Sequence, residues 1–208
     1  MTVQEYLQQK NGESCSCEKQ VLYVREKYNR GVCGMERILM MAALLSGFFG
    51  SGLASELKLG DPAPGLKLKT DEGASFDIQS RKGQWTVLYF YPKADTPGCT
   101  KQACAFRDNI SQIRKLGAEI FGVSADGVDA LKKFRKNHNL NFTLLADPGL
   151  DAIKAYGTKM PVVSMSKRWT FIIDPELRIR AIERDVDPVL DAKRVAEKLQ
   201  QLQSQSRR

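Results

Sequence analysis

Apolar residues follow two different patterns along the chain from Leu57 onward. Continuous runs rich in β-branched and aromatic residues predict strands that are covered on both faces. Such strands are predicted at 86–91, 119–124 and 169–173, with shorter ones at 143–145 and 179–182. Apolar residues at helical spacing predict helices at 100–116, 128–137 and 150–156, and a final helix from Pro188 through Val189, Val195 and Leu199. Strands that alternate with helices indicate an α/β fold, with a central mixed sheet, helices on its faces and an antiparallel hairpin at its end.

The stretch 38–53 departs from this pattern. Its apolar core of about a dozen residues has the length of a signal-peptide core and is short for a membrane span. Gly52-Leu53-Ala54 then offers small side chains at a possible cleavage site. We therefore expect 35–54 to be an export signal, so that the mature protein is periplasmic and does not span a membrane. The alternative is a buried hydrophobic helix in a cytoplasmic protein.

Residues 1–34 fit export poorly, because signal peptides begin near the N-terminus. Met35 is a natural start, so the segment before it can be an upstream extension that the functional protein lacks. Cys15 and Cys17 could form half of a metal site, but no histidine or second cysteine pair lies nearby at ligand spacing. We expect them to be incidental thiols and predict no metal site.

Composition and charge limit the number of domains and the classes of protein to which the chain can belong. A length of 208 residues allows one well-buried domain, which we place at 55–202, with a flexible tail at 203–208. The net charge of +8 would suit a nucleic acid, but Lys and Arg are scattered among acidic residues. We therefore expect a solvated basic surface and no nucleic-acid partner. Five cysteines are too few, and too unevenly placed, for a disulfide-stapled scaffold.

The strongest chemical signal follows the first long strand, in the run Tyr91-Pro92-Lys93-Ala94-Asp95-Thr96-Pro97-Gly98-Cys99-Thr100. A cysteine in the first turn of a helix meets unpaired backbone N–H groups and the positive end of the helix dipole, which favour the reactive thiolate. Pro92 and Pro97 stiffen the loop, and Gly98 permits a ligand to approach the backbone. Thr96 can place a hydroxyl beside the sulfur. Cys99 is therefore a candidate nucleophile rather than only a small buried side chain.

The pattern Pro92-x-x-x-Thr96-x-x-Cys99 resembles the active-site signature of the peroxiredoxins. Together with Cys104 and Phe106-Arg107-Asp108, it is similar to the subfamily called bacterioferritin comigratory protein or peroxiredoxin Q. The resemblance covers roughly 57–202 and includes Arg168, where the family carries its active-site arginine. One position departs from the pattern, because Gln102 stands where many relatives have Glu. Gln keeps the hydrogen-bonding shape but removes a negative charge from any network that relied on it.

The resemblance implies a thioredoxin-like fold and reduction of hydrogen peroxide and organic hydroperoxides by Cys99, which passes through a sulfenic acid. It implies that Cys104 resolves this acid as a Cys99–Cys104 disulfide, which thioredoxin or a similar dithiol reduces. Arg168 would stabilise the thiolate and the charge that develops on the peroxide, while Thr96 would accept from the peroxide and donate to the sulfur. We assign substrate binding to Pro92, Pro97 and Gly98. We expect a monomer without a dissociable cofactor.

Simpler roles stay open for several of these side chains. Cys104 can be a structural cysteine on the buried side of its helix, and Arg168 taken alone could form a surface ion pair. His138, the only histidine, stands at a predicted helix end, where it suits capping or solvent. Trp85 and Trp169 belong to predicted strands and are expected to pack.

Two other functions compete with peroxide reduction. A disulfide oxidoreductase of the thioredoxin type would share the fold class, but that activity prefers Cys-x-x-Cys, and the spacing here is Cys-x-x-x-x-Cys. A redox sensor or holdase would use oxidation of Cys99 as a signal without turnover. Turnover with a dithiol donor separates both alternatives from a peroxidase.

Overall fold

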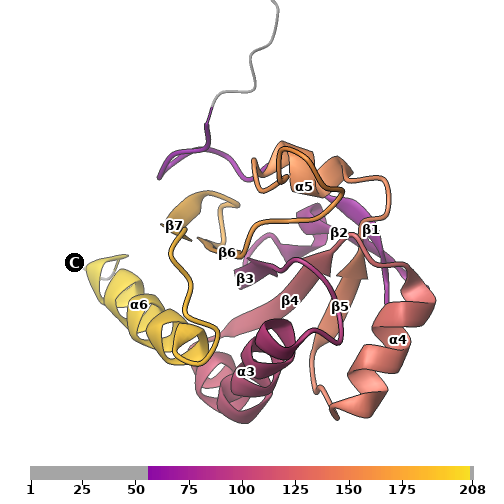
Figure 1. The fold of residues 1–208 in the computed structure, drawn as a ribbon. Coiled ribbons are helices and arrows are strands. Elements are labelled where there is room, and N and C mark those ends of the chain that lie inside the picture. The colour runs from indigo at the N-terminus through magenta and orange to yellow at the C-terminus, as the bar shows by residue number, and fades with distance from the viewer. Residues whose placement is uncertain (1–55, 207–208) are drawn as a thin grey trace, which may run out of the picture. The chain divides into compact units, whose positions relative to one another are not determined.

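Seven strands form one mixed sheet at the centre of the region that the computed structural model describes, residues 56–206 (Figure 1). The strands are β1 (Lys67–Thr70), β2 (Ser75–Asp77), β3 (Trp85–Phe90), β4 (Ala118–Ser124), β5 (Thr143–Ala146), β6 (Trp169–Ile173) and β7 (Ile179–Glu183). Their order across the sheet is β2-β1-β5-β4-β3-β6-β7. The pairs β3·β4 and β4·β5 are parallel and the other pairs are antiparallel. The expected central mixed sheet is therefore confirmed.

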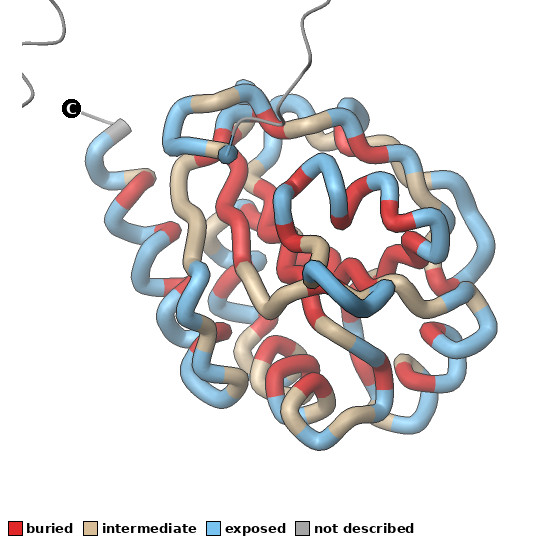
Figure 2. Tube along the Cα trace, turned by 45° about the horizontal axis from the view of Figure 1, so that its top comes forward, coloured by how far each residue is buried: buried red, intermediate tan, exposed pale blue. Residues whose placement is uncertain are grey.

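Helices cover both faces of this sheet (Figure 1). They are α3 (Pro97–Lys115), α4 (Val128–Asn137), α5 (Asp151–Ala155), α6 (Asp191–Ser206) and the 3₁₀ helix η1 (Ile78–Arg81). One apolar cluster joins α3, α4 and α6 to alternate residues of the central strands, such as Val87 and Tyr89. A second cluster joins α5 and η1 to the opposite face, through residues such as Leu88 and Phe90. Figure 2 shows the buried strands between these layers.

Most predicted elements are confirmed to within one residue. The helix at 128–137 and the strand at 169–173 agree with the structure at both ends, and the antiparallel hairpin of β6 and β7 is present. The helix predicted at 100–116 begins earlier, at Pro97, because Thr96 already provides an extended N-cap. The strands β1 and β2 were not predicted. Both are short, and none of their residues is buried, so they carry little apolar signal.

The C-terminal prediction was wrong at both ends of the helix. Pro188 and Val189 lie in a turn, and α6 begins at Asp191. The Asp187 carboxylate accepts from the backbone N–H of Val189 at 2.8 Å and stabilises that turn. Val189, which was predicted to belong to this helix, is 59% exposed, whereas Val195 and Leu199 are buried. The helix continues through Ser206, so residues 203–206 are helical and do not belong to a frayed tail.

The predictions for the N-terminal segments cannot be compared with residues 56–206. The extension 1–34 and the signal-like segment 35–54 lie outside the described residues, as do Cys15 and Cys17. Among residues 56–206, no helix has both the length and the apolar character needed to cross a bilayer.

Candidate active site

The loop after β3 delivers Cys99 to the first turn of α3. Thr96 is the N-cap residue, and its carbonyl accepts the first helical bond from the Thr100 N–H at 2.8 Å. Pro97 takes the first helical position, where a missing N–H costs nothing because no partner exists for it inside the helix. Cys99 is then the third helical residue, and only 2% of its surface is exposed. The sulfur therefore sits at the positive end of a long helix.

Two contacts hold this loop in place, and neither was predicted. The Asp126 carboxylate accepts from the Ala94 backbone N–H at 2.8 Å and from the Ser124 hydroxyl at 2.9 Å. The Nε2 of His138 lies 2.8 Å from Oδ1 of Asp95, whose φ of +56° places it in the left-handed region. His138 follows the end of α4, as expected, but it anchors the cysteine loop instead of facing solvent alone. A tertiary contact of this kind leaves no pattern in the sequence.

Arg168 reaches the sulfur from the residue just before β6. Its Nη2 lies 3.3 Å from Cys99 Sγ, and its Nη1 donates to Gln102 Oε1 at 2.6 Å. Gly98 leaves room for this approach, because a Cβ atom there would make a tight contact of 3.3 Å with the Arg168 Nη2. The structure thus brings Cys99, Gly98 and Arg168 together from two segments about seventy residues apart in the chain. A half-buried guanidinium against a buried sulfur is a suitable electrostatic partner for a thiolate.

Gln102 connects Arg168 to a buried carboxylate that sequence reasoning missed. The Gln102 Nε2 donates to Asp191 Oδ2 at 2.6 Å, and the Thr170 hydroxyl donates to the same oxygen at 2.8 Å. Gln102, Thr170 and Asp191 are all at most 1% exposed. Burial raises the pKa of Asp191 to about 6, although the hydrogen bonds from Gln102 and Thr170 oppose this shift. Asp191 could have been found only as an acidic residue in a helical first turn, which is a common feature.

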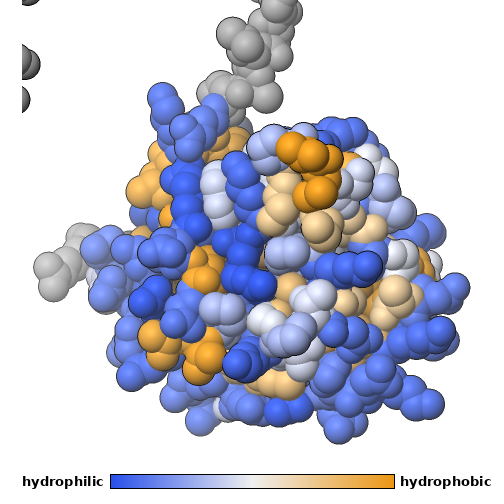
Figure 3. All heavy atoms as spheres, viewed as in Figure 1, coloured by the Kyte–Doolittle hydropathy of each residue, from blue (hydrophilic) through white to orange (hydrophobic). Residues whose placement is uncertain are grey.

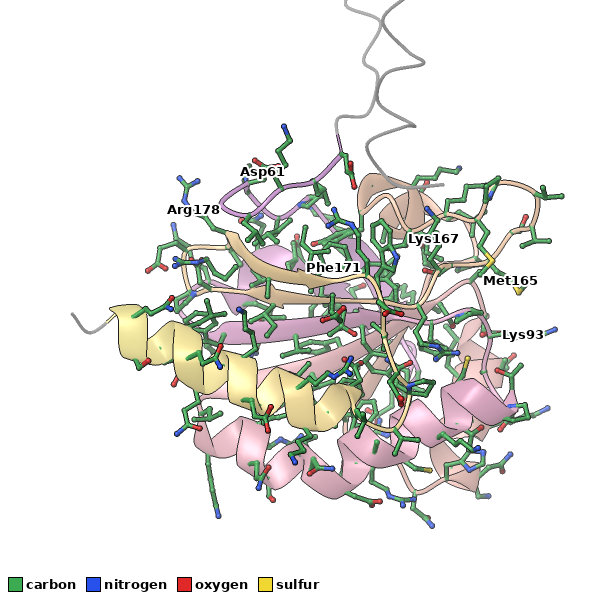
Figure 4. All side chains as sticks on the ribbon, turned by 60° about the vertical axis from the view of Figure 1, so that its left-hand side comes forward. Asp61, Lys93, Met165, Lys167, Phe171 and Arg178 are labelled. Atoms are coloured by element: carbon green, nitrogen blue, oxygen red, sulfur yellow. The ribbon has the colours of Figure 1, made fainter. Side chains whose placement is uncertain are left out.

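Thr96 and Pro92 belong to the loop before Cys99, and Pro97 is the first residue of α3. The Thr96 hydroxyl donates to the Lys93 carbonyl at 2.9 Å, so its single proton is engaged there and not at the sulfur. Its oxygen keeps lone pairs that can accept a hydrogen bond. Pro92 is half-buried and Pro97 is exposed. In Figure 4, Lys93 from this loop and Met165 from the segment before β6 lie at the same end of the sheet, whereas Arg178 and Asp61 lie at the other end.

Cys104 shares α3 with Cys99 but lies on a different side of the helix. The buried positions of the first turns are Cys99, Gln102, Ala103 and Phe106, while Cys104 is partly exposed. Both cysteines are free thiols in this structure. The tryptophans pack as expected, since Trp85 and Trp169 lie partly buried against the two apolar clusters.

The outer surface is mostly hydrophilic on the face shown in Figure 3, where charged and polar side chains dominate. This face also carries an apolar patch near α5. In the segment after α5, Val162 is 95% exposed. Within residues 56–206, no group of three or more His, Cys, Asp or Glu side chains is arranged to hold a metal ion.

Comparison with known proteins gives a consistent set of relatives. The model of the AhpC/TSA family matches residues 59–182. A Coxiella burnetii bcp peroxiredoxin is 42% identical over 132 residues, which are 61% of this chain and 87% of the relative. The crystal structure of Xylella fastidiosa PrxQ matches with a TM-score of 0.67 and 29% identity, covering 71% of this chain and 98% of that one.

A structure of the Xanthomonas campestris bacterioferritin comigratory protein, described for its alkyl peroxide reduction activity, matches with a TM-score of 0.63 and 29% identity. It covers 65% of this chain and 90% of that chain. These neighbours confirm the expected thioredoxin-like fold. With a family model that spans more than half of its length, the chain belongs to the AhpC/TSA family, as a peroxiredoxin of the Bcp and peroxiredoxin Q type.

Proposed function

We propose that this protein is a thiol peroxidase that reduces hydrogen peroxide and organic hydroperoxides with Cys99 as the nucleophile. The observation that carries the proposal is the 3.3 Å contact between Cys99 Sγ and the Arg168 guanidinium, at the N-terminus of α3. A helix N-terminus and a permanent cation both favour the thiolate, which is the form that attacks. The relatives support the same activity, because they are peroxiredoxins by name.

In the first step, the Cys99 thiolate attacks the terminal oxygen of the hydroperoxide. A sulfur–oxygen bond forms as the oxygen–oxygen bond breaks, so that the sulfur is oxidised to sulfenic acid and the leaving oxygen takes up a proton as water or an alcohol. Arg168 stabilises the negative charge that develops on the peroxide oxygens. The Thr96 oxygen accepts a hydrogen bond from the peroxide, because its own proton is engaged by the Lys93 carbonyl. Gly98, Pro92 and Pro97 shape the loop that receives the substrate.

In the second step, the Cys104 thiol attacks the sulfenic sulfur, and the hydroxyl leaves as water. This step requires α3 to change shape. Five residues along a regular helix separate two Cα atoms by about 8.6 Å, with a rise of about 7.5 Å and a rotation of about 140°. A disulfide rarely spans more than about 7 Å between Cα atoms. The first turns of α3 therefore unwind before the Cys99–Cys104 disulfide forms, and thioredoxin or a similar dithiol then reduces it.

The test is peroxide consumption by the full chain with thioredoxin, thioredoxin reductase and NADPH. We expect turnover that Cys99→Ser abolishes, together with a Cys99–Cys104 disulfide in peptide maps of the oxidised protein. Reduction of insulin disulfides without peroxide turnover would instead indicate a thioredoxin-type oxidoreductase. Rapid oxidation of Cys99 without recycling would indicate a sensor. Failure to find the disulfide would remove Cys104 as the resolving residue.

A second proposal concerns the cellular location and the oligomeric state of the protein. We propose that the protein is exported to the periplasm and that its mature chain begins at Ser55, on the basis of the apolar segment and the Gly52-Leu53-Ala54 site. We further propose that the mature protein is a monomer. Mass spectrometry of the native protein tests this directly. An intact N-terminus that includes Met1 in a cytosolic fraction would contradict it.

A further inference from the structure

We propose that Asp191 is the positioning residue of this active site, which supplies through Gln102 the buried negative charge that orients Arg168 toward Cys99. The inference rests on the proposed peroxidase function and concerns the same site. Its basis is an unbroken series of contacts from the first turn of α6 to the sulfur. Asp191 Oδ2 accepts from Gln102 Nε2 at 2.6 Å, Gln102 Oε1 accepts from Arg168 Nη1 at 2.6 Å, and Arg168 Nη2 lies 3.3 Å from Cys99 Sγ.

The polarity of this series explains why the charge matters. An amide has a donor end and an acceptor end, and the ends can exchange by rotation of the side chain. With Asp191 ionised, only one orientation of Gln102 is favourable, because the opposite one would set two acceptors against each other at Asp191 and two donors at Arg168. The carboxylate therefore fixes the Gln102 oxygen toward the guanidinium. A protonated Asp191 can donate to that oxygen, which removes the penalty at Asp191 and leaves only the clash of two donors at Arg168 to hold the orientation.

This arrangement also accounts for the glutamine at position 102. A carboxylate at that position would place a charge directly beside Arg168, and Gln102 removes it. The structure supplies a carboxylate one side chain farther from the sulfur, on a different element. The Gln102 amide is fully buried, so its contact with the ionised carboxylate is unscreened by solvent.

Asp191 is held by neutral donors and is not directly ion-paired. Its Oδ2 accepts from Gln102 and Thr170, while its Oδ1 is buried without a hydrogen-bond partner. Asp191 lies in the wall of a cleft of about 690 Å³ that is lined by the N-terminal end of the described chain, β7 and α6. A carboxylate with so few donors changes protonation more easily than one that is fully satisfied.

The charged and titratable groups around Asp191 come from every neighbouring element. Glu183 on β7 raises the pKa of Asp191 by repulsion, and Arg168 before β6 lowers it by attraction. The charge of Asp191 in turn helps to raise the pKa of the buried Tyr89 on β3. The cleft also carries the basic side chains Lys58, Arg180, Arg184, Arg194 and Lys198. Its remaining acidic side chains are Glu56 and Glu197. Of these two, Glu56 is already bound to Arg184 at 3.0 Å. Because burial dominates, the pKa of Asp191 rises to about 6, and the orienting charge is lost as the pH falls through that value.

The experiment uses the full chain and two variants, one that removes the Asp191 charge and one that moves it to position 102. Asp191→Asn keeps the shape and the acceptor for Gln102 but removes the charge. The double variant Gln102→Glu/Asp191→Asn places the carboxylate at position 102, where it accepts directly from Arg168 while the amide introduced at position 191 donates to it. Asp174→Asn is the matched control, because Asp174 is an equally buried carboxylate at the opposite end of β6.

Two rates are measured for each protein across the pH range. Stopped-flow mixing gives the rate constant for oxidation by hydrogen peroxide. Mass spectrometry of the Cys99 peptide gives its alkylation rate with iodoacetamide, which needs the thiolate but no stabilisation of a developing oxyanion. The ratio of the two rates isolates the contribution of Arg168 from the ionisation of Cys99 itself.

In the wild type, we expect this ratio to rise between about pH 5 and pH 7, one unit either side of the Asp191 value. Asp191→Asn should lower the ratio at neutral pH by roughly tenfold, less than the loss of a charged donor itself costs, and remove the rise. The double variant should recover most of the loss, and Asp174→Asn should resemble the wild type. A ratio in Asp191→Asn equal to the wild type would overturn the inference, as would a double variant no faster than Asp191→Asn. A wild type that alkylates at Cys99 but is not oxidised by peroxide would instead refute the proposed function.

Discussion

Two buried carboxylates flank β6 at its opposite ends, and they are held in different ways. Asp174, just after the strand, accepts from the backbone N–H groups of Glu176 at 3.1 Å and Arg178 at 2.8 Å, and from Arg180 Nη1 at 3.2 Å. Asp191, beside Thr170 near the start of the strand, accepts only from neutral side chains and leaves one oxygen without a partner. Asp174 is a structural residue that closes the turn between β6 and β7.

The difference separates a carboxylate whose hydrogen bonds are complete from one that neutral donors satisfy only in part. Both of the Asp174 oxygens have hydrogen-bond donors, so its charge is used within the turn. The charge of Asp191 has fewer hydrogen-bond donors, which lowers the stability of the fold. In our proposal this charge orients Gln102 and, through it, Arg168. Under-satisfied buried polar groups of this kind are few in folded proteins, and each calls for a physical explanation.

The largest expected effect comes from removing the arginine at the active-site end. Arg168→Ala should slow Cys99 oxidation by about 10²- to 10³-fold, because it removes the cation to which we assign stabilisation of the transition state. The domain should stay folded, since Arg168 is only half-buried. Arg178→Ala is the control at the other end, where the side chain donates to the Gly60 carbonyl. Stopped-flow oxidation measures both, and a near wild-type rate in Arg168→Ala would remove its assigned role.

Oxidation should distinguish the two ends by their mobility. If the Cys99–Cys104 disulfide requires α3 to unwind, backbone amides of residues 99–107 should exchange much faster in the oxidised protein. The turn around Asp174 contacts neither cysteine, so amides of residues 174–179 should exchange at the same rate in both forms. Hydrogen exchange followed by mass spectrometry reports both regions. A disulfide-bonded structure that retains this part of α3 would contradict the mechanism.

The cost of the Asp191 charge should be visible as a dependence of stability on pH. Its pKa is raised from 3.8 to about 6 on folding, so the native state binds a proton that the unfolded state has released between these values. Its contribution to stability is therefore fully present below about pH 4 and is lost as the pH rises through 6. The loss amounts to about 3 kcal/mol, at 1.36 kcal/mol for each pKa unit.

Asp191→Asn isolates this contribution, because the variant stays neutral at every pH. Relative to the wild type, the free energy of unfolding of this variant should increase by about 2 to 3 kcal/mol as the pH is raised from 4 to 7. Urea titrations at each pH measure the difference. Asp174→Asn should show no such gain at neutral pH, because it breaks satisfied contacts. A stability difference between Asp191→Asn and the wild type that does not change with pH would show that the carboxyl group does not titrate in this range.

The smallest expected effect lies at Gly98. An alanine there adds a Cβ atom 3.3 Å from Arg168 Nη2, so the guanidinium must shift by a few tenths of an ångström. Oxidation by peroxide should slow by about two- to fivefold, since small misplacements of a charged donor weaken its effect. Stability should rise by about 0.5 to 1 kcal/mol, because alanine is the better helix former. Thermal unfolding and stopped-flow kinetics measure the two changes, and an unchanged rate would mean that Arg168 moves freely.

The sequence by itself determined the positions of the central strands, of one helix and of the helical turn that carries Cys99. The buried strands at 86–91, 119–124 and 169–173 could be predicted because each is a continuous apolar run rich in β-branched and aromatic residues, and the helix at 128–137 because its apolar residues recur at helical spacing. The Thr96-Pro97-Gly98-Cys99 run also predicted a cysteine in the first turn of a helix, because capping and the position of proline depend on adjacent residues. These features are local, and local features leave a pattern in the chain.

Only the tertiary structure decided what surrounds the sulfur. Asp191 lies 89 positions from Gln102 in the chain, and its role depends on the packing of α6 against α3 and β6. The same holds for His138 and Asp126, which fix the cysteine loop from other elements. The start of α6 at Asp191 rather than at Pro188 follows from the turn that Asp187 stabilises and from burial of Asp191 beside Thr170. A buried charge is shaped by neighbours that the fold brings together from distant positions, and no spacing in the sequence records them.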